Sequence, residues 1–169
     1  VAIIGGGIMG VSLLYHLAKE GWKDLVLIEK GELTSGSTWH AAGQCPQMMG
    51  SYNLAKVHLE STNLYKKLEK ETGQPTGFHG CGSLRIAYKQ EDLDWFKYVK
   101  GIMDNIGAPA EIISTNEIRK VHPFIKLDEI IGAFYTPDDG HTDPTSTTNA
   151  MAKGARNFGA KIYRKNRVT

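Results

Sequence analysis

The pattern of apolar positions changes from strand-like to helical within the first thirty residues. VAII at 1–4 is a short apolar run typical of a buried parallel strand. After the glycines at 5–7, apolar residues recur at helical spacing over 8–20, and Gly21 then ends the predicted helix. DLVLIE at 24–29 is a second apolar strand. Strand, glycine turn, helix and strand in this order predict a βαβ unit.

The rest of the chain alternates between helices and strands and contains no internal repeat. Residues 31–52 are rich in Gly, Ser and Thr, which predicts a loop. Ser114, with Glu117 three residues later, forms a capping box for one helix, and Pro144 suits the first turn of another. Apolar spacing predicts helices over 53–72, 92–106, 115–121 and 144–158, and strands within 77–89, 111–113, 130–137 and 160–169.

Three glycines, Gly5, Gly7 and Gly10, form a GxGxxG pattern between the first strand and the first helix. The first makes a tight turn, the second lets the backbone approach a pyrophosphate, and the third lets helix and strand pack closely. The helix N-terminus offers N–H groups and a partial positive charge to phosphate. Glu29 follows about 20 residues later and can accept hydrogen bonds from a ribose hydroxyl. Because this acid disfavours a 2′-phosphate, the motif predicts FAD or NAD rather than NADP.

The stretch after Glu29 favours FAD over NAD. A NAD-binding Rossmann domain would have a third strand soon afterwards, whereas this chain runs into the loop TSGSTWHAAG. Fully extended, the residues from Glu29 to His40 reach roughly 36 Å, enough to follow a long dinucleotide away from its ribose. His40 would then lie near the flavin ring. Hydroxyls and bare backbone N–H groups suited to phosphate come from Ser35, Gly36, Ser37 and Thr38.

This layout predicts an α/β fold: an FAD-binding, Rossmann-like βαβ unit with a mixed α+β insertion that belongs partly to a substrate domain. We expect the FAD-binding unit and flavin loop at 1–45, the insertion at 46–143, and a return to the FAD-binding domain at 144–169. The chain starts at Val1 inside an apolar run and stops at Thr169 in an extended segment. We therefore expect a piece of a longer polypeptide, truncated at both ends, with an incomplete nucleotide fold.

The segment IIGGGIMGVSLLYHLAKEGWKDLVLIEKGELTSGSTWHAAG resembles the amino end of the dimethylglycine dehydrogenase and sarcosine dehydrogenase family, flavoproteins of the D-amino-acid-oxidase-like fold. Further matching stretches are NLAKVHLESTNLYKKLEKETGQPTGFH, GSLRIA, DDGHTDP and AKGARNFGA, so the resemblance covers nearly the whole chain. In that family the histidine of the WHAAG motif is joined to the flavin 8α-methyl group. The resemblance therefore implies that His40 is the attachment residue.

The glycine motif and the resemblance together give a set of expected cofactor contacts. Trp39 is expected to pack against the flavin or shield the link, with an ordinary core position as the alternative; for His40 the alternative is a hydrogen bond to FAD without a covalent bond. Val168 is expected near the adenine. The full set is Gly5, Gly7, Ile8, Met9, Gly10, Glu29, Lys30, Gly36, Ser37, Thr38, Trp39, His40, Ala41, Ala42, Gly43, Gln44 and Val168.

The resemblance implies oxidative N-demethylation of a small N-methylated amino acid, dimethylglycine or sarcosine. The electrons would leave to a flavoprotein carrier or to oxygen. Relatives capture the one-carbon unit in a carboxy-terminal folate-binding region, which these residues do not contain. The family's substrate-binding and catalytic residues lie mostly beyond residue 169, so none is assigned. The expected location is the mitochondrial matrix for a eukaryotic source and the cytoplasm for a bacterial one.

Two other functions remain open at this point. One is a D-amino-acid-oxidase-like flavoenzyme that acts on another amine or amino acid, with FAD bound covalently or not. The other is a regulatory, non-catalytic paralogue of this family that associates with a phosphatase. Activity on a panel of amines distinguishes a flavoenzyme that acts on another amine from an N-demethylating enzyme. The presence of flavin at His40 argues against the regulatory paralogue.

Composition and charge exclude several further classes. An apolar content of 41% and 169 residues fit one ordinary globular domain. The net charge is only +2, with basic residues scattered among acids, so no nucleic-acid surface is expected. No apolar run approaches the roughly 18 residues of a membrane span. Cys45 and Cys81 have neither CxxC nor zinc spacing and are expected to be ordinary thiols, and no metal site is expected.

The remaining histidines are weaker candidates for function. His16 lies among apolar neighbours on the first helix and is expected to be structural. For His58 and His122 we expect solvent-facing or capping roles. His79 and His141 lie in glycine-rich surroundings and are the two that could line an active site.

One acidic cluster lies in the turn-rich stretch PDDGHTDP. Its members are Asp138, Asp139 and Asp143. Asp is common in turns and at helix N-caps, where its carboxylate accepts backbone hydrogen bonds. We therefore expect turn and helix-cap residues here rather than a site.

Overall fold

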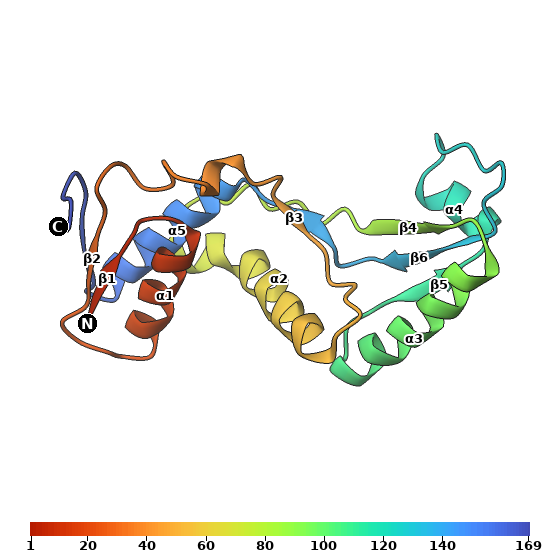
Figure 1. Ribbon diagram of the computed structural model, residues 1–169, viewed down its shortest axis with the longest axis horizontal. Helices are drawn as coiled ribbons and strands as arrows, with labels where there is room; N and C mark the ends of the chain where they lie inside the picture. The colour runs from red at the N-terminus through yellow and green to blue at the C-terminus, as the bar shows by residue number, and fades with distance from the viewer. The chain divides into compact units, whose positions relative to one another are not determined.

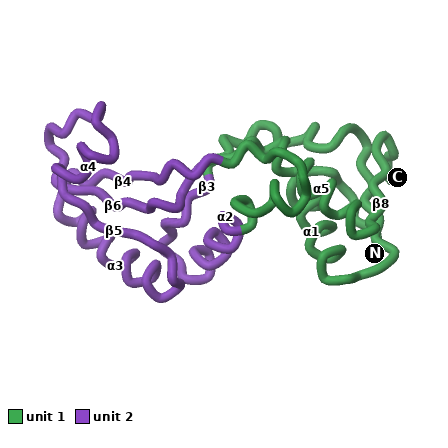
Figure 2. Tube along the Cα trace, turned by 180° about the vertical axis from the view of Figure 1, so that it is seen from behind, with its two compact units in different colours: residues 1–44, 64–78, 141–169 green, residues 45–63, 79–140 purple.

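The computed structural model describes all residues from 1 to 169 and divides them into two compact units. Unit 1 comprises residues 1–44, 64–78 and 141–169, and unit 2 comprises residues 45–63 and 79–140 (Figure 2). The expected domain boundaries after residues 45 and 143 remain predictions. In space, however, residues 64–78 group with unit 1 rather than with the rest of the expected insertion.

Unit 1 contains the predicted βαβ unit. Strands β1 (Ala2–Ile4), β2 (Val26–Ile28) and β8 (Lys161–Tyr163) form a parallel sheet in the order β1-β2-β8. Helix α1 (Ile8–Lys19) joins the first two strands, and α5 (Pro144–Asn157) leads into the third (Figure 1). The sequence-based prediction of an α/β fold in which the last segment returns to the first sheet is confirmed.

The core of unit 1 lies between the sheet and its two helices. Leu27 from β2 and Leu14 from α1 are fully buried there, and each such side chain stabilises the fold by roughly 1.5–3 kcal/mol. Helix α5 contributes small residues, which let it approach α1 closely. At Gly154 an added Cβ would lie 2.6 Å from the ring of Tyr15, so only glycine permits this distance between the helices.

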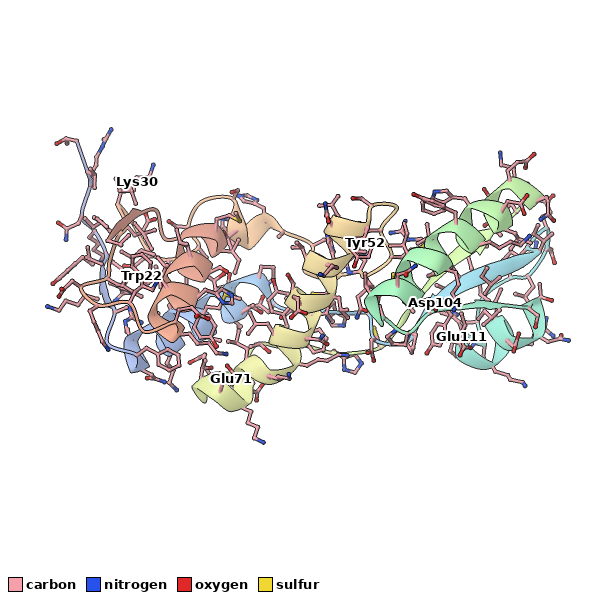
Figure 3. All side chains as sticks on the ribbon, turned by 90° about the horizontal axis from the view of Figure 1, so that it is seen from below. Trp22, Lys30, Tyr52, Glu71, Asp104 and Glu111 are labelled. Carbon is pink, nitrogen blue, oxygen red and sulfur yellow. The ribbon has the colours of Figure 1, made fainter.

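The end of helix α2 (Tyr52–Thr72) explains why residues 64–78 belong to unit 1. Leu68 is fully buried in the core of that unit. Near it, Tyr15 donates a hydrogen bond of 2.7 Å to Glu71, in the last turn of α2 (Figure 3), and Lys19 contacts the same carboxylate at 2.9 Å. Hydrogen bonds from Tyr15 and then Lys19 lower the pKa of Glu71.

Unit 2 is built on an antiparallel sheet with the order β4-β6-β5, formed by β4 (Ser83–Ala87), β6 (Gly132–Thr136) and β5 (Glu111–Ile113). Helix α3 (Gln90–Ile106) packs on one face of the sheet. Its Phe96 contacts Phe134 of β6, with 5.6 Å between the ring centroids. Helix α4 (Thr115–Val121) buries Ile118 against the other face and begins with the predicted capping box. Figure 1 shows α3 running along the sheet.

Several short elements differ from the sequence-based prediction. The last strand ends at Tyr163 instead of continuing to residue 169, because Lys165 has a φ of 56° and Asn166 N–H turns back to the carbonyl oxygen of Glu29 at 2.9 Å. Three elements were not predicted: the 3-10 turn η1 (Thr38–His40) and the paired strands β3 (Gln44–Cys45) and β7 (Gly140–His141). No helix combines the length and apolar character needed to cross a membrane.

The acidic cluster is only partly as expected. Asp143 is a helix N-cap, accepting a hydrogen bond of 2.6 Å from Ser146 N–H, which confirms that prediction. Asp139 closes the expected turn, with its N–H 3.4 Å from the carbonyl oxygen of Thr136, but it is also buried, with only 1% exposed. Its carboxylate accepts hydrogen bonds from Gln47 N–H at 2.8 Å and from the hydroxyls of Ser83 and Thr136 at 2.6 Å each. Asp139 therefore joins three segments of unit 2.

Replacing Asp139 with alanine is expected to lower the free energy of unfolding by about 2–4 kcal/mol, because three donors lose a charged acceptor inside the protein. The matched control is Asp128→Ala, which removes a side chain that is 70% exposed and paired only with Lys126; it should cost less than about 0.5 kcal/mol. Chemical denaturation of both variants measures the difference. Equal effects from the two substitutions would contradict the assigned role of Asp139.

Candidate cofactor-binding site

The turn between β1 and α1 depends on two glycines. Gly5 has a φ of 110°, in the region that favours glycine, and its N–H donates to the carbonyl oxygen of Ile28 at 2.9 Å. A Cβ on Gly10 would overlap the carbonyl oxygen of Gly5. The helix can therefore begin directly at the end of the strand only because both positions are glycine, as the GxGxxG pattern predicts.

The N-terminus of α1 has the properties of an anion site. Gly7 is the N-cap residue, and it provides no side chain to cap the helix. The first turn contains no acidic residue, so the partial positive charge of the helix end is not neutralised there. Ile8 N–H is bonded to the hydroxyl of Thr38 at 3.0 Å. The N–H groups of Met9 and Gly10 belong to the first turn and are available to a phosphate.

Glu29 lies at the end of β2 and is held by backbone donors on both sides. Its two carboxylate oxygens accept hydrogen bonds from Gly31 N–H at 2.7 Å and from Gly6 N–H at 2.6 Å. These bonds, with that from Gly31 first, lower the pKa of the Glu29 carboxyl. A carboxylate has about four lone-pair sites, so the fixed, ionised group can still accept hydrogen bonds from ribose hydroxyls.

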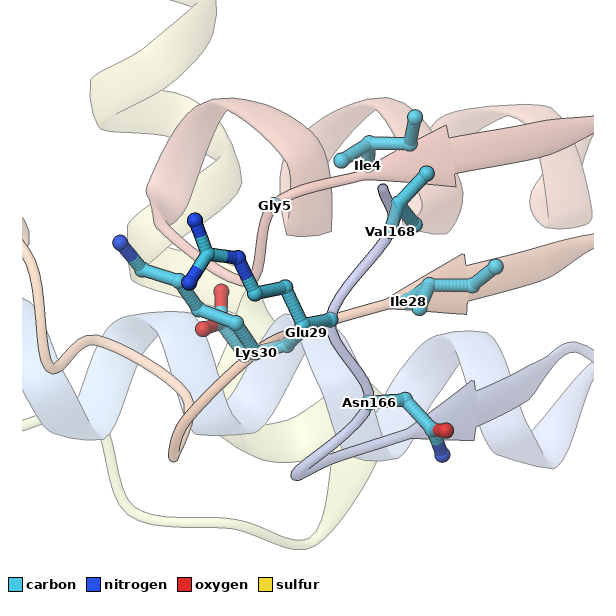
Figure 4. Close-up of a pocket in the computed structure, with 8 residues that line it drawn as sticks. Ile4, Gly5, Ile28, Glu29, Lys30, Asn166 and Val168 are labelled. Carbon is cyan, nitrogen blue, oxygen red and sulfur yellow. The ribbon is translucent and has the colours of Figure 1, made fainter.

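A pocket of about 230 Å³ lies beside this carboxylate. In Figure 4 the side chains of Ile4, Ile28 and Val168 lie near the ends of the strands, and Glu29 follows just beyond the end of β2. The volume is below the roughly 300–1,000 Å³ of a pocket for a whole drug-sized ligand, so it suits one end of a dinucleotide. An apolar surface next to a ribose acceptor is the chemistry that an adenosine group requires. The lining residues are Ile4, Gly5, Ile28, Glu29, Lys30, Asn166, Arg167 and Val168.

The loop after Glu32 carries the Trp-His pair on the turn η1. Thr38 is buried, whereas Trp39 is 58% exposed and His40 is also exposed. The indole and imidazole rings of the pair lie 3.8 Å apart between centroids, at 33° to each other. Trp39 is therefore not a core residue. The pair presents a stacked aromatic surface and a ring nitrogen to whatever binds at this face of unit 1.

The other loop residues expected at the cofactor divide into two groups. Gly43 has a φ of 73°, and a Cβ there would overlap the carbonyl oxygen of Thr142, so packing alone requires glycine at this position. Gln44 forms part of β3. Four further residues of the loop are exposed: Gly36, Ser37, Ala41 and Ala42. Their contacts with a cofactor remain predictions.

Sequence reasoning missed five residues of the site: Ile4, Gly6, Ile28, Asn166 and Arg167. Gly6 donates to Glu29, and its lack of a side chain is needed, since a Cβ would lie 2.7 Å from Leu33 and 2.9 Å from Glu29. The run of three consecutive glycines at 5–7 was the available signal. Asn166 and Arg167 reach the pocket only because the chain turns back after β8, and no sequence pattern indicates that turn.

The remaining candidates include no group of three or more His, Cys, Asp or Glu side chains that could hold a metal ion. His16 is exposed and lies edge-on to its chain neighbour Tyr15, with 5.2 Å between ring centroids, and its structural role remains a prediction. His58 lies 2.7 Å from the carbonyl oxygen of Pro46 through Nδ1. Burial, with the nearby charge of Asp139, raises the pKa of the Cys45 thiol to about 11, which keeps it protonated at neutral pH. His79 and His141 are exposed, and a role in an active site remains a prediction for both.

The strand, the glycine turn, the helix end and the fixed acid together define a dinucleotide-binding protein. The sequence model of one family, described as "FAD dependent oxidoreductase", matches residues 1–169, the whole chain. The chain therefore belongs to the family of FAD-dependent oxidoreductases, and the dinucleotide that fits this site is FAD.

Two individual relatives show which proteins this chain resembles. Dimethylglycine dehydrogenase from the mitochondria of Rattus norvegicus is 49% identical over 160 residues, which are 95% of this chain and 19% of the relative. The mitochondrial pyruvate dehydrogenase phosphatase regulatory subunit of Mus musculus is 39% identical, over 96% of this chain and 19% of the relative. The chain thus spans about a fifth of the length of these relatives.

Solved structures show the same fold. L-proline dehydrogenase from P. horikoshii superposes with a TM-score of 0.90 at 33% sequence identity, covering 99% of this chain and 44% of the other. Glycine oxidase from Geobacillus kaustophilus gives a TM-score of 0.77 at 28% identity, covering 99% of this chain and 46% of that one. Both units of the present structure therefore have counterparts in these two proteins.

Replacing Gly10 with alanine is expected to reduce the flavin content per polypeptide at least about tenfold, because the new Cβ would push α1 away from the Gly5 carbonyl and displace the phosphate-binding N–H groups. The matched control is Gly101→Ala in helix α3, where an added Cβ meets no neighbour within 4 Å. That variant should keep its flavin. Flavin absorbance per mole of purified protein measures both, and a flavin-replete Gly10→Ala protein would contradict the assignment of this turn.

Proposed function

We propose that this protein is an FAD-dependent dehydrogenase that oxidises a small N-methylated amino acid, with dimethylglycine as the preferred substrate. The observation that carries the proposal is the cofactor cradle of unit 1, where the helix end at Ile8, the fixed carboxylate of Glu29 and the exposed Trp39-His40 pair follow one another along the chain. Dimethylglycine is favoured over sarcosine because rat dimethylglycine dehydrogenase is 49% identical and human sarcosine dehydrogenase 35% identical.

Each part of the cradle has a task in holding FAD. Glu29 accepts hydrogen bonds from the adenosine ribose, beside the apolar surface of Ile4 and Val168, which packs against the adenine. The N-terminus of α1 stabilises the pyrophosphate through N–H groups and the helix dipole. When bound, FAD would supply the redox chemistry, the removal of a hydride from an N-methyl carbon of the substrate. The proposed electron acceptor is a flavoprotein carrier or oxygen.

His40 is proposed as the residue that attaches FAD covalently. Its imidazole is exposed on η1, and an imidazole nitrogen with a free lone pair is a nucleophile. In the net reaction the imidazole loses one N–H bond, the 8α-methyl group loses one C–H bond, and one N–C bond forms. Two electrons and two protons are released to molecular oxygen, which becomes hydrogen peroxide. Attachment keeps the cofactor in place through turnover.

The wider setting follows from the same relatives. The rat and human relatives are mitochondrial by name, so the matrix is the proposed location in a eukaryotic cell and the cytoplasm in a bacterial one. A folate-binding region, where present in the full-length protein, would take up the one-carbon unit that demethylation releases. These two proposals concern the whole protein and do not depend on the geometry of unit 1.

The full-length protein with His40→Ala is expected to lose its covalent flavin. After acid precipitation, flavin fluorescence should lie in the pellet for the wild-type protein and in the supernatant for the variant. His122→Ala, which changes an exposed histidine of unit 2, is the control and should leave the flavin in the pellet. Wild-type flavin found wholly in the supernatant would contradict the covalent bond while leaving FAD binding intact.

Substrate choice is tested by anaerobic reduction of the bound flavin. Dimethylglycine is expected to abolish the visible flavin absorption faster than sarcosine at equal concentration, and 4-methylaminobutanoate should act more slowly than both. The last compound is included because 4-methylaminobutanoate oxidase of Paenarthrobacter nicotinovorans is 34% identical to this chain. Faster reduction by 4-methylaminobutanoate or by an unmethylated amino acid would contradict the proposed substrate.

A second function is supported by one of the relatives. The 39% identity to the phosphatase regulatory subunit makes a non-catalytic role the alternative. That role predicts a full-length protein without bound flavin, or one whose flavin none of these amines reduces. Reduction by dimethylglycine excludes it.

A further inference from the structure

The turn that carries the proposed attachment residue is fastened to the phosphate-binding helix by one side chain. The hydroxyl oxygen of Thr38 accepts a hydrogen bond of 3.0 Å from Ile8 N–H, the first N–H group of α1. Thr38 is only 8% exposed, while the next two residues, Trp39 and His40, are exposed. Thr38 is therefore the inward-facing member of η1, and the turn's other two side chains face outward.

The anchor leaves little freedom between Thr38 and His40. Inside the turn, His40 N–H donates to the carbonyl oxygen of Ser37 at 3.2 Å, and Ala41 N–H donates to that of Thr38 at 3.2 Å. The hydroxyl also lies close to the backbone of Gly7, where a Cβ would be 3.0 Å away. A glycine at the helix N-cap thus makes room for the threonine. The His40 backbone is held two residues from a fixed point on α1.

The ring of His40 is restrained as well. It stacks on Trp39 with centroids 3.8 Å apart, which limits rotation of the imidazole about its side-chain bonds. A histidine on a free loop would sample many orientations, and ordering its side chain on cofactor binding would cost conformational entropy. The hydrogen bonds of η1 restrain the backbone of His40, and the stacking on Trp39 restrains its ring.

Thr38 was expected from the sequence to offer its hydroxyl to phosphate. In the structure the hydroxyl oxygen accepts the Ile8 N–H bond while its own O–H can still donate, so the expected contact with phosphate remains a prediction. We propose that Thr38 is a positioning residue for flavin attachment: it links the helix end that binds the pyrophosphate to the turn that presents His40. This inference rests on the covalent attachment proposed above. It predicts that Thr38 affects the rate at which the covalent bond between His40 and the flavin forms.

The test compares Thr38→Val with Thr38→Ser in the full-length protein. Valine keeps the β-branched shape but has no hydroxyl, so Ile8 N–H loses its acceptor, whereas serine keeps the hydroxyl. Flavin-free protein is mixed with saturating FAD, samples are quenched with acid over time, and covalent flavin in the pellet gives the attachment rate. Because FAD is saturating, a change in the affinity for FAD does not alter the measured attachment rate. The control is Thr34→Val, which changes a threonine of the same loop that is 5% exposed and whose hydroxyl meets only Thr145, at 3.5 Å.

Thr38→Val is expected to slow attachment at least about tenfold, while Thr38→Ser and Thr34→Val stay within about threefold of the wild-type rate. A merely structural role would lower the melting temperature of Thr38→Val and Thr34→Val alike without separating their rates. If Thr38→Val does not fold, Thr38→Ala is measured against Thr38→Ser in the same way. A wild-type rate in the variant without the hydroxyl overturns the role of Thr38 alone. Absence of covalent flavin in the wild-type protein overturns both this inference and the proposed attachment at His40.

Discussion

The close approach of Gly10 to the carbonyl oxygen of Gly5 is the constraint on which the site depends. It allows α1 to start directly at the end of β1, with its first N–H groups at the edge of the sheet. Because β1 and β2 are parallel neighbours, Glu29 lies at the same edge and receives the N–H of Gly6. Helix dipole and fixed carboxylate are thereby brought together by backbone geometry alone.

The same edge organises the rest of unit 1. Thr38 docks its turn on α1, and the chain after β8 turns back so that Asn166 N–H reaches the carbonyl oxygen of Glu29. Behind the edge, Leu14 and Leu27 are fully buried in a core that α5 and the end of α2 complete. A firm core beneath an edge made of loops and helix ends is the arrangement that holds a ligand with little reorganisation. Unit 2 has its own cores and its own buried acid.

How much of this the sequence predicts depends on the range of the interactions involved. Amphipathic spacing located every long helix, and local chemistry located the capping box at Ser114 and the turn at Gly5, since both depend on near neighbours. The sequence did not predict that Asp139 is buried or that Arg167 lines the pocket. Both depend on contacts between distant segments. Strands of two residues, such as β3, carry no periodicity that a sequence pattern could reveal.

An experimental structure of the full-length protein with FAD bound tests the proposed cofactor site most directly. We expect a Glu29 carboxylate oxygen within hydrogen-bonding distance of an adenosine ribose hydroxyl, still bonded to the N–H groups of Gly6 and Gly31. We also expect the pyrophosphate at the N-terminus of α1. An FAD whose adenosine lies outside the pocket of Ile4 and Val168, or a Glu29 side chain turned away from the ribose, would contradict the proposed site.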